Sequence, residues 1–173
     1  MLDARLKLPC LVRALDVTQF PMQRDYASAH VRYSTSGERV AKWGNWHCGE
    51  NKIRFDARWT GDQASYIEPF ISGDAVRIVL IGDQYWQIKL EGEDWLKSIH
   101  ADDAHFMPVD SALLEDTRNI REAFGLEMVA NDYMVAEDGR KILLEVNHIP
   151  NVTRFSEIRN AYVDFVVGWL NAT

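Results

Sequence analysis

Two carboxylates lie close together in a β-rich part of the sequence. The run NDYMVAEDGRKILLEVN, residues 131–147, contains Asp138-Gly139 between two apolar stretches. This dipeptide favours a hairpin with a two-residue loop, and counting back from that loop places Asp132 opposite Glu145. Directly opposed carboxylates repel each other. A divalent cation, a nearby arginine or a raised pKa on one acid must therefore offset the charge.

Side-chain alternation decides which groups accompany the two acids. The same register places Val135 opposite Ile142. One face then carries Asp132, Met134, Leu143, Glu145 and Asn147, and the other carries Tyr133, Val135, Ile142, Leu144 and Val146. Two carboxylates and the amide oxygen of Asn147 form a hard oxygen site that suits Mg²⁺, or Mn²⁺ in its place. The alternative is a solvated hairpin face whose acids bind no metal.

Composition excludes several classes of protein. The chain has 173 residues, 47% of them hydrophobic and 26% charged, which is typical of a soluble globular domain. A net charge of −7 argues against broad binding of nucleic acid. No apolar run is long enough to span a membrane, and the first residues do not form a secretory signal. Two cysteines without a disulfide pattern indicate a reducing, cytoplasmic setting.

Apolar periodicity predicts an α+β fold with a mostly antiparallel sheet and helices packed on it. We expect strands at 8–15 and within 62–71, and hairpins at 28–43 (around Ser36-Gly37) and 75–90. Asp110 and Gly125 are capping residues for a helix between them. A final helix is predicted over 156–170, with an apolar stripe, including Trp169 and Leu170, that packs in the core.

With these pieces in order, residues 66–151 resemble the ATP-grasp superfamily of carboxylate–amine ligases, which includes glutathione synthetase and D-alanine–D-alanine ligase. Asp132, followed thirteen residues later by Glu145-Val146-Asn147, matches the family's metal motif. The resemblance implies that Asp132, Glu145 and Asn147 hold Mg²⁺ against the phosphates of ATP. It also implies two α+β lobes with mostly antiparallel sheets and the nucleotide between them. We assign residues 1–71 to a small lobe and residues 72–173 to a large lobe.

The run YIEPFISGD is similar to the family's hinge strand, which contacts adenine. The resemblance implies that Glu68 takes the acid position of this strand and that Phe70 and Ile71 lie beside the base. Asp74 is a candidate for binding a ribose hydroxyl. An apolar slot with a few polar groups at its edge is what adenine requires. The alternative is an ordinary buried strand interrupted by its proline.

Cationic side chains supply candidates for binding phosphate. Arg77 projects from the apolar strand AVRIVLIG, on the face opposite Val76 and Ile78, and a buried guanidinium requires anions. The resemblance implies that Arg77 faces the phosphates or an acyl phosphate and that Lys89 is the family's phosphate-binding lysine. Taken alone, Lys89 reads equally as a lysine at a strand end in water.

The N-terminal third departs from the family pattern. Arg13 stands where the family has a lysine that reaches the α-phosphate, and no glycine-rich flap is present, because no glycine precedes Gly37. The run QFPMQRDYASAHV takes the place of that flap and supplies Arg24. Near the other end of the chain, Arg154 is a candidate for binding a substrate carboxylate, or it pairs at the surface.

The resemblance implies an ATP-dependent ligase. A carboxylate attacks the γ-phosphate to give an acyl phosphate, and an amine or another nucleophile then displaces phosphate. The substrates are small-molecule or peptide carboxylates and amines. Because the family has an additional N-terminal domain, we expect either a fragment or a short member completed by a partner chain or a homodimer. The rival hypotheses are a non-catalytic ATP-binding module with a regulatory or assembly role, and a structural α+β domain without a nucleotide.

Overall fold

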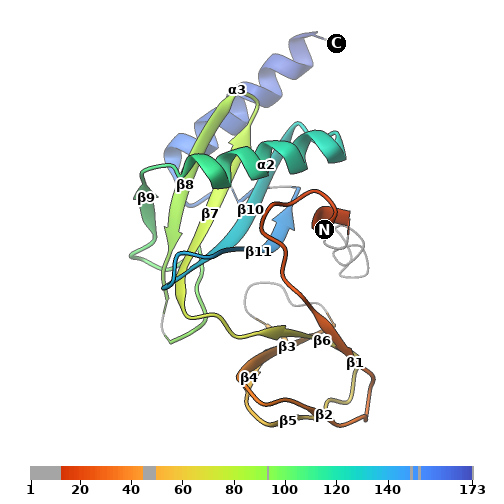
Figure 1. Cartoon of the computed structure of the whole chain (residues 1–173). Coiled ribbons are helices and arrows are strands. Elements are labelled where there is room, and N and C mark those ends of the chain that lie inside the picture. The colour runs from red at the N-terminus through yellow and green to blue at the C-terminus, as the bar shows by residue number, and fades with distance from the viewer. Residues whose placement is uncertain (1–12, 45–49, 93, 149, 152, 173) are drawn as a thin grey trace.

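The computed structural model describes residues 13–44, 50–92, 94–148, 150–151 and 153–172. Within these residues lie two larger antiparallel sheets and one two-stranded sheet (Figure 1). The first sheet has the strand order β1-β6-β3-β4. Its strands are β1 (Asp25–Ala27), β6 (Ser65–Pro69), β3 (Arg39–Trp43) and β4 (Lys52–Phe55). A separate pair of short strands packs aromatic side chains against it, β2 (Tyr33–Ser34) and β5 (Arg58–Trp59).

The second sheet has the order β11-β10-β7-β8-β9, and each pairing in it is antiparallel. Its strands are β7 (Gly73–Ile81), β8 (Gln84–Leu90), β9 (His105–Met107), β10 (Met128–Ala136) and β11 (Lys141–Asn147). Helix α2 (Ser111–Phe124) covers one face and α3 (Ser156–Ala172) covers the other (Figure 1). The predicted hairpin of β7 and β8 is confirmed.

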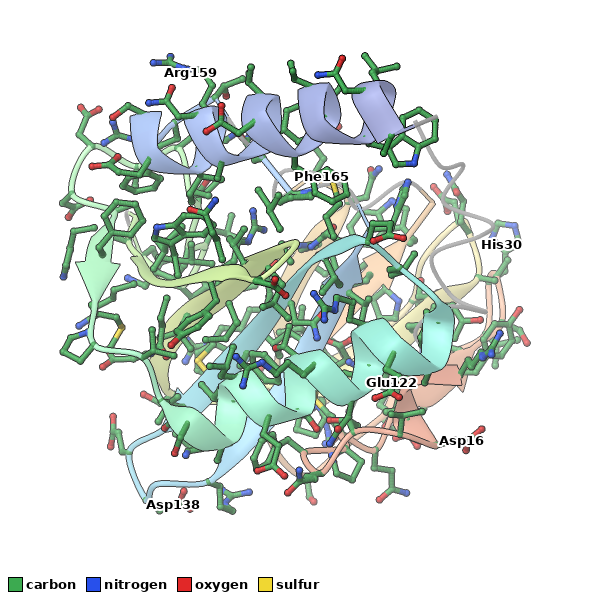
Figure 2. The ribbon with its side chains drawn as sticks, turned by 90° about the horizontal axis from the view of Figure 1, so that it is seen from above. Asp16, His30, Glu122, Asp138, Arg159 and Phe165 are labelled. Carbon is green, nitrogen blue, oxygen red and sulfur yellow. The ribbon has the colours of Figure 1, made fainter. Side chains whose placement is uncertain are left out.

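Apolar residues on both faces of β7 explain why the sheet has a helix on each side. Val76, Ile78 and Leu80 pack towards α2. The alternate residues Val79 and Ile81 pack towards α3. Figure 2 shows α2 and α3 on opposite sides of the strands, with Phe165 between α3 and the sheet. By alternation Arg77 lies on the same face as Val79 and Ile81, opposite Val76 and Ile78 as predicted.

Helix α2 begins and ends where the sequence predicts. The Asp110 side chain accepts hydrogen bonds from the backbone N–H groups of Ala112 and Leu113, and Gly125 adopts a left-handed φ of 62°. Helix α3 is buried only in its first half. Ile158 is fully buried, whereas Trp169 is 57% exposed, so the prediction that the whole apolar stripe packs in the core was wrong. Among the described residues, neither helix is long and apolar enough to cross a membrane.

The N-terminal third differs from the expected arrangement. Residues 13–15 are helical, not a strand, and the rest of the predicted strand 8–15 lies outside the described residues. The predicted 28–43 hairpin is absent from the described residues, because β3 pairs with β4 and β6 to bury Val40 and Ala41. The segment from Ala14 to Phe20 packs on the second sheet. Long-range pairing therefore overrides the local hairpin signal.

The loop between β10 and β11 is longer than predicted. The N–H of Ala136 donates to the carbonyl of Arg140, and Gly139 has a φ of 83°, which defines a three-residue loop. The extra residue shifts the pairing of the strands by one position. Ile142 therefore does not face Val135, and that part of the predicted register was wrong.

A β-bulge in the same hairpin reverses this shift. Tyr133 pairs with Leu143, but Asp132 pairs with Glu145, so Leu144 is the additional residue. Leu143 packs with Tyr133 beneath α2, not on the face of the two acids where we placed it. The predicted opposition of Asp132 and Glu145 is confirmed, because two one-residue shifts of opposite sign cancel.

Candidate functional site

The two acids of the hairpin lie beside an arginine from the next strand. Asp132 faces Glu145 on one side and Arg77 on the other. Arg77 Nε lies 2.6 Å from Asp132 Oδ1, and Arg77 Nη2 lies 2.7 Å from Oδ2. Both side chains are largely buried, at 13% and 12% exposed. This two-bonded ion pair compensates the charge of the Asp132 carboxylate. A nearby arginine was one of the three means by which we expected the repulsion between the two acids to be offset.

Asn147 lies on the same face as the two acids, as predicted, since Asn147 pairs with Ala130 and Glu145 pairs with Asp132. The amide Nδ2 of Asn147 is buried and makes no hydrogen bond within the described part of the chain. A buried amide donor of this kind suits a phosphate oxygen, and rotation of the amide would present its oxygen to a cation. The donor set therefore fits a magnesium–phosphate group. The described residues hold no cluster of three or more His, Cys, Asp or Glu side chains arranged for a metal.

Two lysines of the first sheet approach this face, and neither was predicted from the sequence. Lys42 of β3 and Lys52 of β4 are cross-strand neighbours. Burial and the charge of Lys42 lower the pKa of Lys52, while Glu145 and Asp132 oppose that shift. The carboxylates of the second sheet are therefore close enough for their charges to act on Lys52. Side-chain alternation puts Lys42 on the same face of β3 as the buried Val40, and this was the available signal in the sequence.

Glu68 on β6 is buried and holds two cations. Its Oε1 lies 2.8 Å from Arg24 Nε and its Oε2 lies 2.5 Å from Lys42 Nζ. Burial alone would raise the pKa of the Glu68 carboxyl, but Lys42 and Arg24 outweigh burial and lower it. Arg24 also donates to the carbonyls of Leu143 and Leu144, at 3.2 Å each. Glu68 and Arg24 thus link the first sheet to the bulge of β11.

A cavity between the two sheets joins these groups. We call it the inner cavity, and it is lined by residues from both sheets that include Lys42, Lys52, Phe70, Ile71, Met134 and Glu145. An adjoining outer cavity is lined by Lys52, Arg77, Lys97, Asp132, Glu145 and Asn147, among others. The apolar part of the inner cavity contains Phe70 and Ile71, as expected for a slot that accepts a flat base. Four charged residues line both cavities, Lys52, Lys97, Asp132 and Glu145.

Four predicted site residues lie elsewhere. Lys89 is opposite Val76, so it projects from the face of the sheet that Arg77 does not occupy. There it pairs with Asp74 at 3.1 Å. Arg13 donates to the carbonyl of Ala123 at the end of α2, and Arg154 donates to the carbonyls of Ala101 and Asp102. Strand alternation separates Lys89 and Asp74 from the cluster, and the other two residues have structural partners.

Comparison with solved structures places this arrangement in a known fold. The chain is similar to the ATP-grasp ligase PsnB in complex with a minimal precursor, Mg and ADP, with a TM-score of 0.69, 14% identity, and coverage of 95% of this chain and 59% of PsnB. For the macrocyclase MdnC from Microcystis aeruginosa, bound to the precursor peptide MdnA, the TM-score is 0.60 and the identity 16%, with coverage of 95% of this chain and 61% of MdnC. For the D-cycloserine synthetase DcsG, the TM-score is 0.65 and the identity 13%, with coverage of 98% of this chain and 70% of DcsG.

The chain therefore has the ATP-grasp fold, as the sequence resemblance implied. It spans about 60% of the length of PsnB and MdnC. No protein-family model matches the sequence, and no curated protein matches it at the level of sequence. At 16% identity or less, these likenesses define the fold, and the chemistry must be argued from the residues of the site.

Proposed function

We propose that this chain binds Mg-ATP between its two sheets and activates a carboxylate as an acyl phosphate for attack by an amine or another nucleophile. The observation that supports this most directly is the convergence of charge at the junction of the two cavities. Lys42 and Lys52 come from one sheet, and Arg77, Asp132 and Glu145 come from the other. Cations for phosphate and oxygen ligands for a metal are the two requirements of phosphoryl transfer.

Each group has a distinct part in this proposal. Phe70 and Ile71 contact the base in the inner cavity. Lys42 and Lys52 offset the negative charge of the phosphates. Glu68 does not need to contact the nucleotide, because both of its oxygens already hold cations. We assign it the task of positioning Lys42, which differs from the adenine contact implied by the family resemblance.

The metal would be held by Asp132, Glu145 and Asn147, with Mg²⁺ or Mn²⁺ as the ion. When bound, the ion would supply Lewis-acid chemistry that neutralises the charge of the phosphates. In the transfer itself, a carboxylate oxygen bonds to the γ-phosphorus and ADP leaves. The nucleophile then bonds to the acyl carbon, phosphate leaves, and the proton of the nucleophile passes to solvent.

The acceptor substrates are proposed to be peptide or small-molecule carboxylates. The solved structures support this choice, since PsnB and MdnC were captured with precursor peptides. We propose that a further domain, a partner chain or a second copy completes the substrate site. Arg154, which is exposed, stays a prediction for the substrate carboxylate.

Calorimetric titration of ATP, with and without Mg²⁺, tests the nucleotide site. The native chain is expected to bind ATP more tightly with Mg²⁺, and the Asp132→Asn/Glu145→Gln double variant is expected to lose that dependence. The matched control is Glu137→Gln/Asp138→Asn, which changes the same charges in the exposed loop of the same hairpin. If the double variant and its control bind Mg-ATP equally, the metal assignment is wrong. ADP release with carboxylates and amines then separates a ligase from a non-catalytic ATP-binding module.

A further inference from the structure

The ion pair between Arg77 and Asp132 occupies the carboxylate that a metal would require. The guanidinium uses two nitrogens, at 2.6 and 2.7 Å, and engages both oxygens of Asp132. A carboxylate paired in this way keeps only its outer lone pairs for another ligand. The two strands are hydrogen-bonded neighbours with Arg77 directly opposite Asp132, so the pair is built into the register of the sheet.

Electrostatics makes Arg77 and a divalent ion competitors. A Mg²⁺ ion lies about 2 Å from its carboxylate oxygens, which would bring three positive charges within a few ångströms of one carboxylate. The cations Lys42 and Lys52 face the same region from the first sheet, and burial together with Lys42 already lowers the pKa of Lys52. Glu145 is the further acid on this face. A divalent ion entering alone would therefore have to compete with Arg77 for Asp132, in an outer cavity that Lys52 and Lys97 line together with the acids Glu50 and Glu145.

Phosphate changes this balance, because a nucleotide carries several negative charges. A guanidinium binds phosphate oxygens with the same two-bonded geometry that it uses for a carboxylate. Both Arg77 and Asp132 line the outer cavity, as does Lys52. Because Arg77 lines that cavity, a phosphate group bound there would be a further anionic partner for its guanidinium.

We propose that Arg77 acts as a stand-in cation for Asp132 when the nucleotide is absent, and that the metal gains access to Asp132 when phosphate draws Arg77 away. The inference rests on the proposed Mg-ATP site. It makes metal and nucleotide binding mutually dependent through one side chain, and this coupling is reciprocal by thermodynamic necessity. In the absence of nucleotide, the site therefore binds metal weakly, because Arg77 occupies Asp132.

The test is the affinity of the nucleotide-free protein for Mn²⁺, measured by electron paramagnetic resonance. Arg77→Gln removes the competing cation, and it is expected to bind Mn²⁺ about tenfold more tightly than the native chain, the effect of one lost charged hydrogen-bond pair. Adding Asp132→Asn to this variant should abolish the gain. The control Arg140→Gln removes an exposed partner of Asp138 in the hairpin loop and should leave Mn²⁺ affinity unchanged. An Arg77→Gln protein that binds Mn²⁺ no more tightly than the native chain overturns the inference.

A second variant keeps the test valid if Arg77→Gln fails to fold, and circular dichroism shows whether it has folded. Arg77→Lys keeps the charge but cannot form the two-bonded pair, and it should bind Mn²⁺ about threefold more tightly. If Arg77→Gln does not fold, unchanged affinity in Arg77→Lys overturns the proposal. Calorimetry of the native chain with Mg-ATP separates the two hypotheses. Mg-ATP binding without a gain in Arg77→Gln removes only the stand-in role, whereas an Asp132-dependent gain without Mg-ATP binding removes only the nucleotide function.

Discussion

Replacing Glu68 with glutamine should destabilise the protein strongly. Glu68 is 4% exposed and holds two cations that are themselves nearly buried, with Arg24 at 7% and Lys42 at 13% exposed. The Glu68→Gln variant removes the negative charge while keeping the shape of the side chain. Two buried positive charges then lie next to each other without a counter-charge, which is the costly case for a broken buried ion pair.

The expected loss is about 3–5 kcal/mol in the free energy of unfolding, the usual range when one partner of a buried pair is removed. For a chain of this length, each kcal/mol corresponds to roughly 2–4 °C in the unfolding midpoint. A loss of about 3 kcal/mol therefore predicts a fall of roughly 6–12 °C. The matched control is Glu38→Gln, because Glu38 pairs with Arg54 at the surface, where an ion pair contributes about 0–1 kcal/mol.

Urea unfolding at neutral pH, followed by tryptophan fluorescence, measures both losses. The pH dependence adds a second measurement. Burial raises the pKa of Glu68, but Lys42 and Arg24 lower it by more, so the pKa of this carboxyl in the folded state lies below its ordinary value of 4.5. The stabilisation is therefore present above about pH 4.5 and is lost as pH falls through the folded-state pKa. The native chain and Glu68→Gln should converge in stability in acid. A loss no larger than that of Glu38→Gln would refute this account of the cluster.

Three further predictions concern the backbone and the charges of the site. Gly73→Ala should cost more than about 2 kcal/mol, because the new Cβ would lie 2.1 Å from a carbonyl of the neighbouring strand; Gly37→Ala, which meets nothing within 4 Å, should change urea stability by under about 1 kcal/mol. Lys52 has a lowered pKa, so calorimetric Mg-ATP affinity should fall with rising pH before the usual lysine range near 10.5, and Lys52→Arg should remove this dependence; a pH profile unaffected by that variant would contradict the role. Arg13→Ala and Lys89→Ala should each leave Mg-ATP affinity within about twofold of native, since both side chains lie away from the cavities, and a tenfold loss in either would restore the family-based assignment.

The hairpin shows how far local patterns can be trusted. The prediction that Asp132 opposes Glu145 is confirmed, yet the two-residue loop on which it rested was wrong. The three-residue loop shifts the register by one residue, and the bulge at Leu144 shifts it back, so Asp132 still pairs with Glu145. Turn chemistry does not reveal a bulge, because the extra residue is stabilised by distant groups, here the donation from Arg24 to the carbonyls at the bulge.

The cluster of lysines shows what the sequence could not supply. Lys42 and Lys52 look like ordinary strand residues in a charged stretch, and no local pattern connects them with the β10–β11 hairpin. The family resemblance assigned Lys89 to phosphate binding. Lys89 lies opposite Val76, however, and is therefore on the face of the sheet that Arg77 does not occupy. The register between strands decides such questions, since a shift of one residue moves a side chain to the opposite face.

The sequence by itself determined four strands of the large sheet (β7, β8, β10 and β11), the caps of α2 and the spacing of Asp132 and Glu145, because these depend on alternation, turns and capping within short segments. It did not predict β9. The tertiary structure alone decided which cations meet those acids. It placed Lys52 and Glu145 in the lining of the same cavities, paired Arg77 with Asp132, and paired Arg24 with the buried Glu68. These contacts join segments tens of residues apart, and they arise from the order in which strands pair and from the closure of two sheets around one cavity, which no local pattern specifies.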